Sequence, residues 1–424
     1  MIGTECWKTY KLGDCVNFLS GGTPSKKNPE YWDGSIPWVS CKDMKKAYLY
    51  DSQDHITEKG AANGTRFVSP ETILIVVRGM ILGQHFPVAI AKRKMAFNQD
   101  LKALQCAPNV DPKFLFHWLR GKSYEILGIV DEAAHGTKRL QTDRLQNFPL
   151  HLPPLPIQRK IAAILSAYDD LIENNTRRIE ILEEMARSIY REWFVKFRFP
   201  GHEQVQMVDS ELGLTPQGWL CKFSDYVDFK EGPGLRRWQY REEGIPFLNI
   251  RTLVNNNIDL SKVQFLDPLE VQSKYLHFLL KPYDHVVSSS GTLGRIVTIQ
   301  SHHLPLMLNT SIIRMRPKSS KIEKWQLKHF LQSDYFQNQI RSYASGVAQM
   351  NYGPSHLQQM WIVAPINDIG QRYEELVTPI EELIFGLVKK NDNLRQTRDL
   401  LLPRLISGEI DVENLDINTG EIAA

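Results

Sequence analysis

The sequence lacks the marks of secreted and membrane proteins. Residues 1–10 contain no apolar segment of the signal-peptide type. Apolar runs such as Ile73–Val77 fall far short of the roughly 20 residues that a membrane-spanning helix needs. The five cysteines show no CxxC spacing and are odd in number, which is typical of reduced thiols in a cytoplasm. We therefore expect a cytoplasmic protein that has no membrane partner.

Motifs that carry catalysis are also missing. The chain has no G-x-x-x-x-G-K-[ST] loop for nucleotide phosphates and no nuclease-type acidic dipeptide followed by E-x-K. Asn28–Tyr31 only partly matches the NPPY motif of adenine methyltransferases, because it lacks the second proline. His302 and His303 have no further ligands at metal spacing. We expect no catalytic residue, no metal site and no cofactor bound by this chain.

The sequence contains one unit of about half its length twice, a period far longer than the roughly 20–50 residues of solenoid repeats. Ile36–Val39 (IPWV) returns as Ile245–Leu248 (IPFL), and Gln158-Arg159 returns as Gln371-Arg372. In each copy, short β-branched runs with glycine turns precede an amphipathic helical pattern. This order predicts two similar α+β heads.

Each copy ends in a long heptad pattern. In the first, apolar residues alternate at spacings of four and three from Ile161 to Trp193, and Asn175 is the one polar member. The second runs from Tyr373 to Leu405 and contains Asn391. There we expect a short helix, a break, and a long helix beginning at Pro379, because proline interrupts a continuous helix. A helix packed on its own head is the alternative interpretation of the first pattern.

We expect the two long helices to pair antiparallel, as an intramolecular coiled coil that gives the chain a pseudo-twofold internal repeat. Two buried asparagines opposite each other fix a register in such a seam. Pairing Asn175 with Asn391 also places Trp193 against Tyr373 and sets three further pairs: Ile161 with Leu405, Leu165 with Leu401, and Ile179 with Leu387. A slip by one heptad is the main alternative.

The charge is unevenly distributed. Residues 408–424 hold five acidic residues and no lysine or arginine, so the rest of the chain carries a net charge of +8, compared with +3 for the whole. A moderate basic bias is compatible with binding nucleic-acid phosphates but does not establish it.

Three segments carry a resemblance to a known family: Pro153–Ile161 (PPLPIQRKI), Leu214–Trp219 (LTPQGW) and Leu401–Ile410 (LLPRLISGEI). With the order head, helix, head, helix, they resemble the specificity subunit of type I restriction–modification enzymes along the whole chain. The resemblance implies a first target-recognition domain at 1–156, a spacer helix at 157–198, a linker at 199–218, a second target-recognition domain at 219–367, a second spacer helix at 368–407 and an acidic tail at 408–424.

The resemblance also implies the function and the partners. Each head would read one half of a split target in double-stranded DNA, and the helices would set the gap between the halves. Two modification subunits would dock on the chain and methylate adenine with S-adenosylmethionine. A restriction subunit using ATP and Mg would translocate and cut the DNA. The main alternative is a non-enzymatic scaffold with two protein-binding heads on a coiled coil; a stand-alone enzyme and a DNA binder that dimerises through its helices are further rivals.

Four regions of each head are candidates for DNA contact, because Arg, Lys, Asn and Gln read base edges, whereas Lys, Arg and backbone amides hold phosphates. They are the Ile-Pro strand with the residues after it, the glycine turn, the polar loop before a short helix, and a basic aromatic segment. Solvated loops, a plain hairpin turn, a simple helix cap and, for Arg251, a surface ion pair are the alternatives. The candidates are Lys26, Lys27, Ser40, Lys42, Arg78, Gln84, Thr137, Lys138, Arg139 and Gln141 in the first head, and Arg236, Arg237, Arg241, Asn249, Arg251, Ser289, Ser290, Arg295, Gln349, Asn351 and Tyr352 in the second.

The two copies differ most in the polar loop. Lys138-Arg139 stands in the first head where Ala348-Gln349 stands in the second. We therefore expect the two half-sites to differ and the whole target to be asymmetric.

Overall fold

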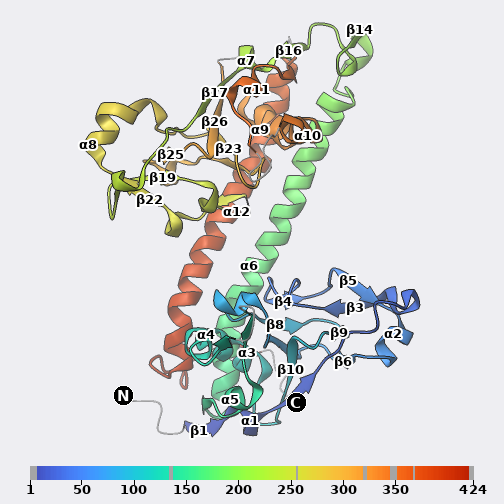
Figure 1. The fold of residues 1–424 in the computed structure, drawn as a ribbon, viewed down its shortest axis with the longest axis vertical. Coiled ribbons are helices and arrows are strands. Elements are labelled where there is room, and N and C mark those ends of the chain that lie inside the picture. The colour runs from blue at the N-terminus through green and yellow to red at the C-terminus, as the bar shows by residue number, and fades with distance from the viewer. Residues whose placement is uncertain are drawn as a thin grey trace. The chain divides into compact units, whose positions relative to one another are not determined.

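The computed structural model describes residues 7–132, 137–254, 256–318, 322–343, 351–365 and 368–419. The chain forms two compact units (Figure 1). Unit 1 comprises residues 1–176 and 389–424, and unit 2 comprises residues 177–388. Within the described ranges, no helix has both the length and the apolar character that crossing a bilayer requires.

Unit 1 is built on two sheets. The five-stranded sheet has the order β2 (Val16–Ser20), β10 (Leu101–Cys106), β7 (Ile73–Val76), β8 (Val88–Ala91), β4 (Tyr48–Leu49). The four-stranded sheet has the order β5 (Asp54–Ile56), β3 (Trp32–Val39), β9 (Met95–Phe97), β6 (Arg66–Val68). Strands β1 (Lys8–Lys11) and β13 (Pro149–Leu152) pair separately. The helices of this head are α1 (Leu12–Cys15), α2 (Glu58–Ala62), α3 (Pro112–Gly121), α4 (Ser123–Leu127) and α5 (Thr142–Gln146).

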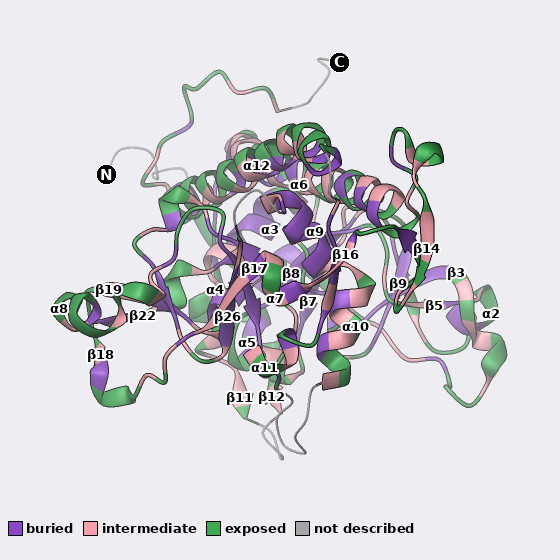
Figure 2. Ribbon diagram, turned by 90° about the horizontal axis from the view of Figure 1, so that it is seen from above, coloured by how far each residue is buried: buried purple, intermediate pink, exposed green. Residues whose placement is uncertain are grey.

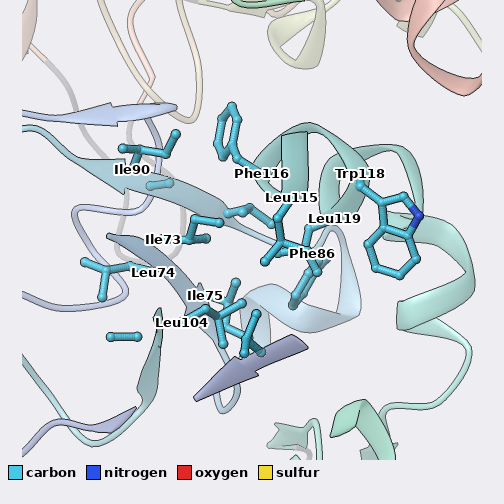
Figure 3. Packing of buried hydrophobic residues seen from close by; sticks show 14 of the residues in the cluster. Ile73, Leu74, Ile75, Phe86, Ile90, Leu104, Leu115, Phe116, Trp118 and Leu119 are labelled. Atoms are coloured by element: carbon cyan, nitrogen blue, oxygen red, sulfur yellow. The ribbon is translucent and has the colours of Figure 1, made fainter. Parts of the chain in front are cut away.

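The core of unit 1 lies between the five-stranded sheet and helix α3. Every residue of β7 and β8 is buried, which explains why these strands are continuous apolar runs rather than alternating ones. Asp111 caps α3 by accepting a hydrogen bond from the Phe114 amide, and Pro112 occupies the first turn. Leu115 and Leu119 of α3 face Ile73 and Ile75 of the sheet (Figure 3).

Unit 2 repeats this plan. Its first sheet has the order β17 (Val227–Glu231), β26 (Ile312–Pro317), β23 (His285–Ser288), β24 (Ile296–Thr298), and its second has the order β18 (Tyr240–Arg241), β22 (Gln264–Leu266), β19 (Ile245–Leu248), β25 (Met307–Leu308). Strands β16 (Leu220–Lys222) and β27 (Trp361–Val363) pair as β1 and β13 do. The main helices of this head are α9 (Lys324–Gln332), α10 (Asp334–Tyr343) and α11 (Pro354–Leu357). Residues expected to form a linker contain a hairpin of β14 (Met207–Ser210) and β15 (Gly213–Pro216).

The strand register confirms the internal repeat in three dimensions. Val39 of β3 pairs in parallel with Phe97 of β9, and Leu248 of β19 pairs in parallel with Leu308 of β25. Parallel pairs between short strands are less common than antiparallel ones, so their recurrence at matched positions indicates one fold used twice. The fold is therefore α+β with two similar sheet-rich heads, as the sequence predicts.

Two long helices, α6 (Leu155–Tyr190) and α12 (Ile369–Ile406), each contribute to both units (green and red in Figure 1). A π-helix, Arg191–Val195, extends α6. Each helix buries one stripe and exposes the other residues, as its mixed colouring in Figure 2 shows. This is the burial that a heptad pattern predicts.

The predicted break at Pro379 is wrong, because α12 is continuous through it. Proline in a helix interior costs about 3 kcal/mol, but tertiary packing surrounds this turn. Tyr373 and Val377 are fully buried, and the indole of Trp325 in α9 donates a 3.1 Å hydrogen bond to the hydroxyl of Thr378. We attribute the continuity of α12 to these contacts.

The helix register agrees with the prediction in both units. In unit 1 the Asn175 carboxamide donates a 2.9 Å hydrogen bond to the Asn391 carboxamide, both side chains being buried. Ile161 and Leu405 lie in the same core cluster there. In unit 2 the rings of Trp193 and Tyr373 are 5.8 Å apart. The helices therefore pair antiparallel within each unit.

Candidate nucleic-acid interface

The glycine turn and the polar loop of unit 1 meet in one structure, which we call the junction of unit 1 (residues 77–84 with 137–141). The amide of Gly79 donates to the carbonyl of Lys138 at 3.0 Å, and the amide of Leu140 donates to the carbonyl of Val77 at 2.8 Å. Arg78 and Arg139 form the antiparallel bridge between these bonds. Gly79 has φ +149°, a conformation that favours glycine over residues with a Cβ. Two of the four predicted regions are thus joined by backbone hydrogen bonds.

Most charged side chains at this junction are held by acidic neighbours. The Arg78 guanidinium lies 3.0 Å from the Asp100 carboxylate, and the Lys138 ammonium lies 2.6 Å from Glu132. A hydrogen bond from Lys138 lowers the pKa of Glu132. These pairs are largely exposed, so they orient side chains more than they stabilise the fold. Gln84 is exposed beside them.

On the far side of the polar loop, Gln141 is held in the same way. Its carboxamide donates a 2.8 Å hydrogen bond to Asp131, and this bond lowers the pKa of Asp131. Asp131 and Glu132 form β11 (Asp131–Glu132), which pairs with β12 (Lys138–Arg139). Thr137, next to β12, is half-buried. The loop is thus anchored on both sides by hydrogen bonds to the acidic strand.

The segment after β3 also reaches this junction. The Cys41 thiol donates to the Arg78 carbonyl at 3.5 Å, and burial raises the pKa of this thiol to about 11, so it stays protonated at neutral pH. Ser40 is 8% exposed, and its hydroxyl donates to Asp43 at 3.1 Å. Lys42 is exposed. Of this predicted region, Lys42 alone presents its side chain to solvent, whereas Ser40 supports the turn.

Unit 2 forms an equivalent junction (residues 288–295 with 351 and 352). The amide of Tyr352 donates to the Ser289 carbonyl at 3.1 Å, and Ser290 bridges Asn351. The Ser288 hydroxyl donates to the Thr292 carbonyl at 2.6 Å and accepts from the Arg295 amide at 2.9 Å, which closes the turn. Such turns aim successive amides outward and can hold a phosphate.

The residues after β19 lie close to this junction. Ser311 connects them, because its hydroxyl accepts from the Ile250 amide and its carbonyl accepts from the Ser289 amide. The Asn249 side chain accepts a 2.9 Å hydrogen bond from the Arg251 amide, so it caps a short turn, while the Arg251 side chain is exposed. The Arg295 guanidinium donates to the Leu253 carbonyl at 2.9 Å.

The basic aromatic segments form a separate feature in each head. In unit 1, Lys26 and Lys27 are exposed, and the Lys26 ammonium lies 5.9 Å from the Trp32 ring centroid. In unit 2, Arg236 and Arg237 are exposed, and Arg241 donates to two carbonyls of its own loop. No hydrogen bond between described residues ties either segment to its junction.

Three candidate residues are buried, which corrects the prediction that their side chains contact DNA. Ser40 is 8% exposed, Ser289 is 1% exposed and Tyr352 is 3% exposed. Tyr352 sits in the core of unit 2, where burial raises the pKa of its phenol well above the ordinary value. Side chains alternate between the two faces of an extended segment, so the residues next to them face outward instead. Gln349 lies outside the described residues.

Three acidic residues decide which cations at the junction are free and were not predicted from the sequence: Asp100, Asp131 and Glu132. No local signal identifies them, because each is brought to its partner by strand pairing. A second omission had a visible signal: Arg398 occupies an apolar seam position of α12, and it forms a 2.5 Å ion pair with Asp169 of α6.

Known proteins show which family the chain is similar to. Residues 4–184 match the family model of the type I restriction modification DNA specificity domain. The MjaIX specificity subunit of Methanocaldococcus jannaschii, a type I restriction enzyme subunit, is 27% identical over 418 residues, which are 96% of this chain and 94% of that one. Along almost its whole length the chain is thus similar to the specificity subunits of type I restriction–modification systems. The EcoR124I/EcoR124II specificity subunit of Escherichia coli is 34% identical over 205 residues, 47% of this chain and 50% of that one.

A solved structure supports the same fold. The S subunit of the type I restriction–modification system of M. genitalium superimposes with a TM-score of 0.58 at 16% identity, covering 96% of this chain and 97% of that one. At this level of identity the likeness concerns the fold.

Proposed function

We propose that the chain is a type I specificity subunit that reads an asymmetric, bipartite DNA target, one half-site with each head, and positions two adenine methyltransferase subunits on it. The observation that carries the proposal is the repeated junction. The bridge between Arg78 and Arg139 in unit 1 has its counterpart in the bridge between Ser290 and Asn351 in unit 2. One backbone frame thus presents different side chains in the two heads, as two different half-sites require.

The helices supply the fixed gap in this proposal. Helices α6 and α12 contain 36 and 38 residues, lengths of about 55 Å at 1.5 Å per residue. Major-groove faces on one side of a DNA duplex recur about every 34–36 Å. A pair of helices in a fixed register can define such a spacing, whereas a flexible linker has a broad distribution of lengths.

Matched heptad insertions test the role of the helices. Seven helix-forming residues are added between Thr176 and Arg177, and seven more between Val388 and Lys389, with the seam pattern preserved. Both points lie where the chain passes from one unit to the other, so each unit keeps its own contacts. We expect the gap between half-sites to lengthen by about three base pairs, since seven residues add about 10 Å and one base pair spans about 3.4 Å.

Two controls make this test specific. The same insertions made of glycine and serine keep the chain length but break the helices, and they should abolish selection of a single gap. An insertion in α6 alone shifts the two helices against each other by one heptad, so the pair of Asn175 with Asn391 and the pair of Trp193 with Tyr373 cannot both form. If the helical insertions left the selected gap unchanged, the ruler role would be refuted.

Partner recruitment needs a separate experiment. The full chain is co-expressed with candidate type I methyltransferase subunits, and methylated adenines are mapped by sequencing. We expect methylation at one bipartite motif, with one adenine in each half. Methylation without a motif, or by the subunits alone, would contradict the proposal. A protein-binding scaffold would instead show no salt-dependent, sequence-selective binding of DNA by the chain.

A further inference from the structure

We infer that Arg139 reads a guanine in the half-site of unit 1, and that Asn351, at the equivalent position of unit 2, reads an adenine in the other half-site. This inference rests on the proposed bipartite reading and deepens it. It assigns one base in each half-site, which comparison of the two polar loops in sequence does not give.

The sequence comparison sets Arg139 against Gln349, but the backbone pairing corrects this and makes Arg139 equivalent to Asn351. The amide of Leu140 donates to the carbonyl of Val77, and the amide of Tyr352 donates to the carbonyl of Ser289. In each case the donor residue is buried, Leu140 at 1% exposure and Tyr352 at 3%. The preceding residue, Arg139 or Asn351, then points to the opposite face of the strand. Both are exposed.

Arg139 is the uncommitted cation of its junction. Arg78 is paired with Asp100 and Lys138 with Glu132. Among the described residues, neither an ion pair nor a hydrogen bond holds the Arg139 guanidinium. Arg139 lies opposite Arg78 on one side, where like charges destabilise the pairing, and opposite Asp131 of β11 on the other. The Asp131 carboxylate accepts hydrogen bonds from Gln141 and Arg144, each at 2.8 Å. The Arg139 guanidinium therefore keeps its donors for a ligand rich in hydrogen-bond acceptors.

Asn351 is equally free. Within the described part of unit 2, no hydrogen bond occupies its carboxamide, and its bridge partner Ser290 is a neutral, half-buried hydroxyl residue. An exposed carboxamide beside a neutral residue has no charge with which to attract a phosphate. It does have a donor and an acceptor side by side, so it can make two hydrogen bonds to the edge of a base.

Base chemistry then separates the two heads. A guanidinium makes two hydrogen bonds to O6 and N7 of guanine, and a carboxamide makes two to N6 and N7 of adenine. Each such pair discriminates against a wrong base by about 5- to 150-fold, the range that 1–3 kcal/mol corresponds to. Arg139 lies on β12 and Asn351 in an isolated β-bridge, so backbone pairing holds each side chain in place, which suits a geometry-dependent contact.

The test is selection of bound duplexes from a randomised pool by the full chain, followed by sequencing. Arg139→Asn should remove the guanine preference at one position of one half-site and leave the other half-site unchanged. Asn351→Arg should replace an adenine preference by guanine in the second half-site only. Arg139→Lys retains the charge but loses the planar fork, so it should weaken the same guanine preference while preserving the affinity for duplexes that lack this guanine.

Arg93→Asn is the matched control, an exposed arginine of unit 1 away from the junction; it should leave every base preference unchanged. Circular dichroism checks that each variant is folded. The inference is overturned if Arg139→Asn weakens all sequences equally and lowers the salt slope by about one, the behaviour of a phosphate contact, or if no position changes. If the unaltered chain selects no bipartite motif at all, the proposed function fails instead.

Discussion

Asp169 connects three elements of unit 1, and its removal offers a quantitative test of how this unit is held together. Its carboxylate lies on α6 and is 5% exposed. It accepts a 2.6 Å hydrogen bond from Arg120 of α3 and a 2.5 Å hydrogen bond from Arg398 of α12. One buried side chain therefore joins the head to both long helices.

The electrostatics indicate that this carboxylate is charged. Burial alone raises the pKa of Asp169, but Arg120 first, and then His117 and Arg398, outweigh burial and hold that pKa below its usual value. Asp169→Asn removes the charge while keeping the shape, and it leaves Arg120 without its carboxylate partner and Arg398 with Asp399 alone. Removing one member of a buried ion pair costs about 3–5 kcal/mol.

The lower end of that range applies here, because the Arg120 side chain is 21% exposed and can turn to water. A loss of about 3 kcal/mol corresponds to a decrease in Tm of about 6–12 °C for a domain of 150–250 residues. We expect Arg398→Gln to cost less, since Asp169 keeps Arg120. The double variant should cost less than the sum of the two, since the residues share one interaction.

Thermal and urea unfolding of the full chain measure the change, and hydrogen exchange assigns it to unit 1. Glu180→Gln is the control, with the same loss of charge at an exposed position of α6; it should change stability by less than about 0.5 kcal/mol. If Asp169→Asn matched this control, or if exchange increased only in unit 2, the network would not hold unit 1 together.

Three further outcomes follow from buried contacts. Asn391→Ala leaves the Asn175 carboxamide without its partner, so the free energy of unfolding measured in urea should fall by about 1–3 kcal/mol. Leucine at both positions should restore this stability but allow other registers. If Asn391→Ala did not change the stability, this would argue against a stabilising polar pair in the seam. A Cβ on Gly121 would lie 2.3 Å from Ile406 Cδ1, so Gly121→Ala should cost about 1–3 kcal/mol, and Ile406→Val should rescue it in the double variant. Burial lowers the pKa of His285 from 6.5 to about 3. As the pH falls below 6.5, the unfolded chain therefore binds a proton that the folded chain does not, and Tm should fall. His285→Asn should partly flatten the dependence of Tm on pH between pH 6.5 and 5, whereas an unchanged slope would exclude this histidine as a source.

The internal repeat and the two long helices could be predicted from the sequence alone, because both follow from the order of residues along the chain. Hydrophobic spacing along one helix is set by its own geometry, so the seam from Ile161 to Trp193 could be read without a partner. The two asparagines could be matched because each stands out in its own apolar stripe. Pro379 shows the limit of this reasoning: local propensity predicts a break, and packing around Tyr373 and Thr378 overrides it.

The candidate interface could be predicted only by region. The sequence indicates which turns and loops are polar, but not which side chains in them are free. Tyr352 and Ser289 have polar side chains but are buried. Each precedes or follows a residue of the bridge between Ser290 and Asn351, and side chains alternate between the two faces of an extended segment, so these two point inward. The pairing of β11 with β12 brings an acidic residue opposite each cation. Glu132 forms an ion pair with Lys138, whereas Asp131, opposite Arg139, bonds to Gln141 and Arg144 instead.

Local periodicity thus determined the duplicated heads, the two helices and their antiparallel register, since these depend on residues close together in the chain or on one conspicuous pair. Only the tertiary structure decided which cations are neutralised, which candidates are buried and that α12 continues through its proline. Those outcomes depend on acidic and aromatic partners that lie far away in sequence, and no spacing along the chain records them.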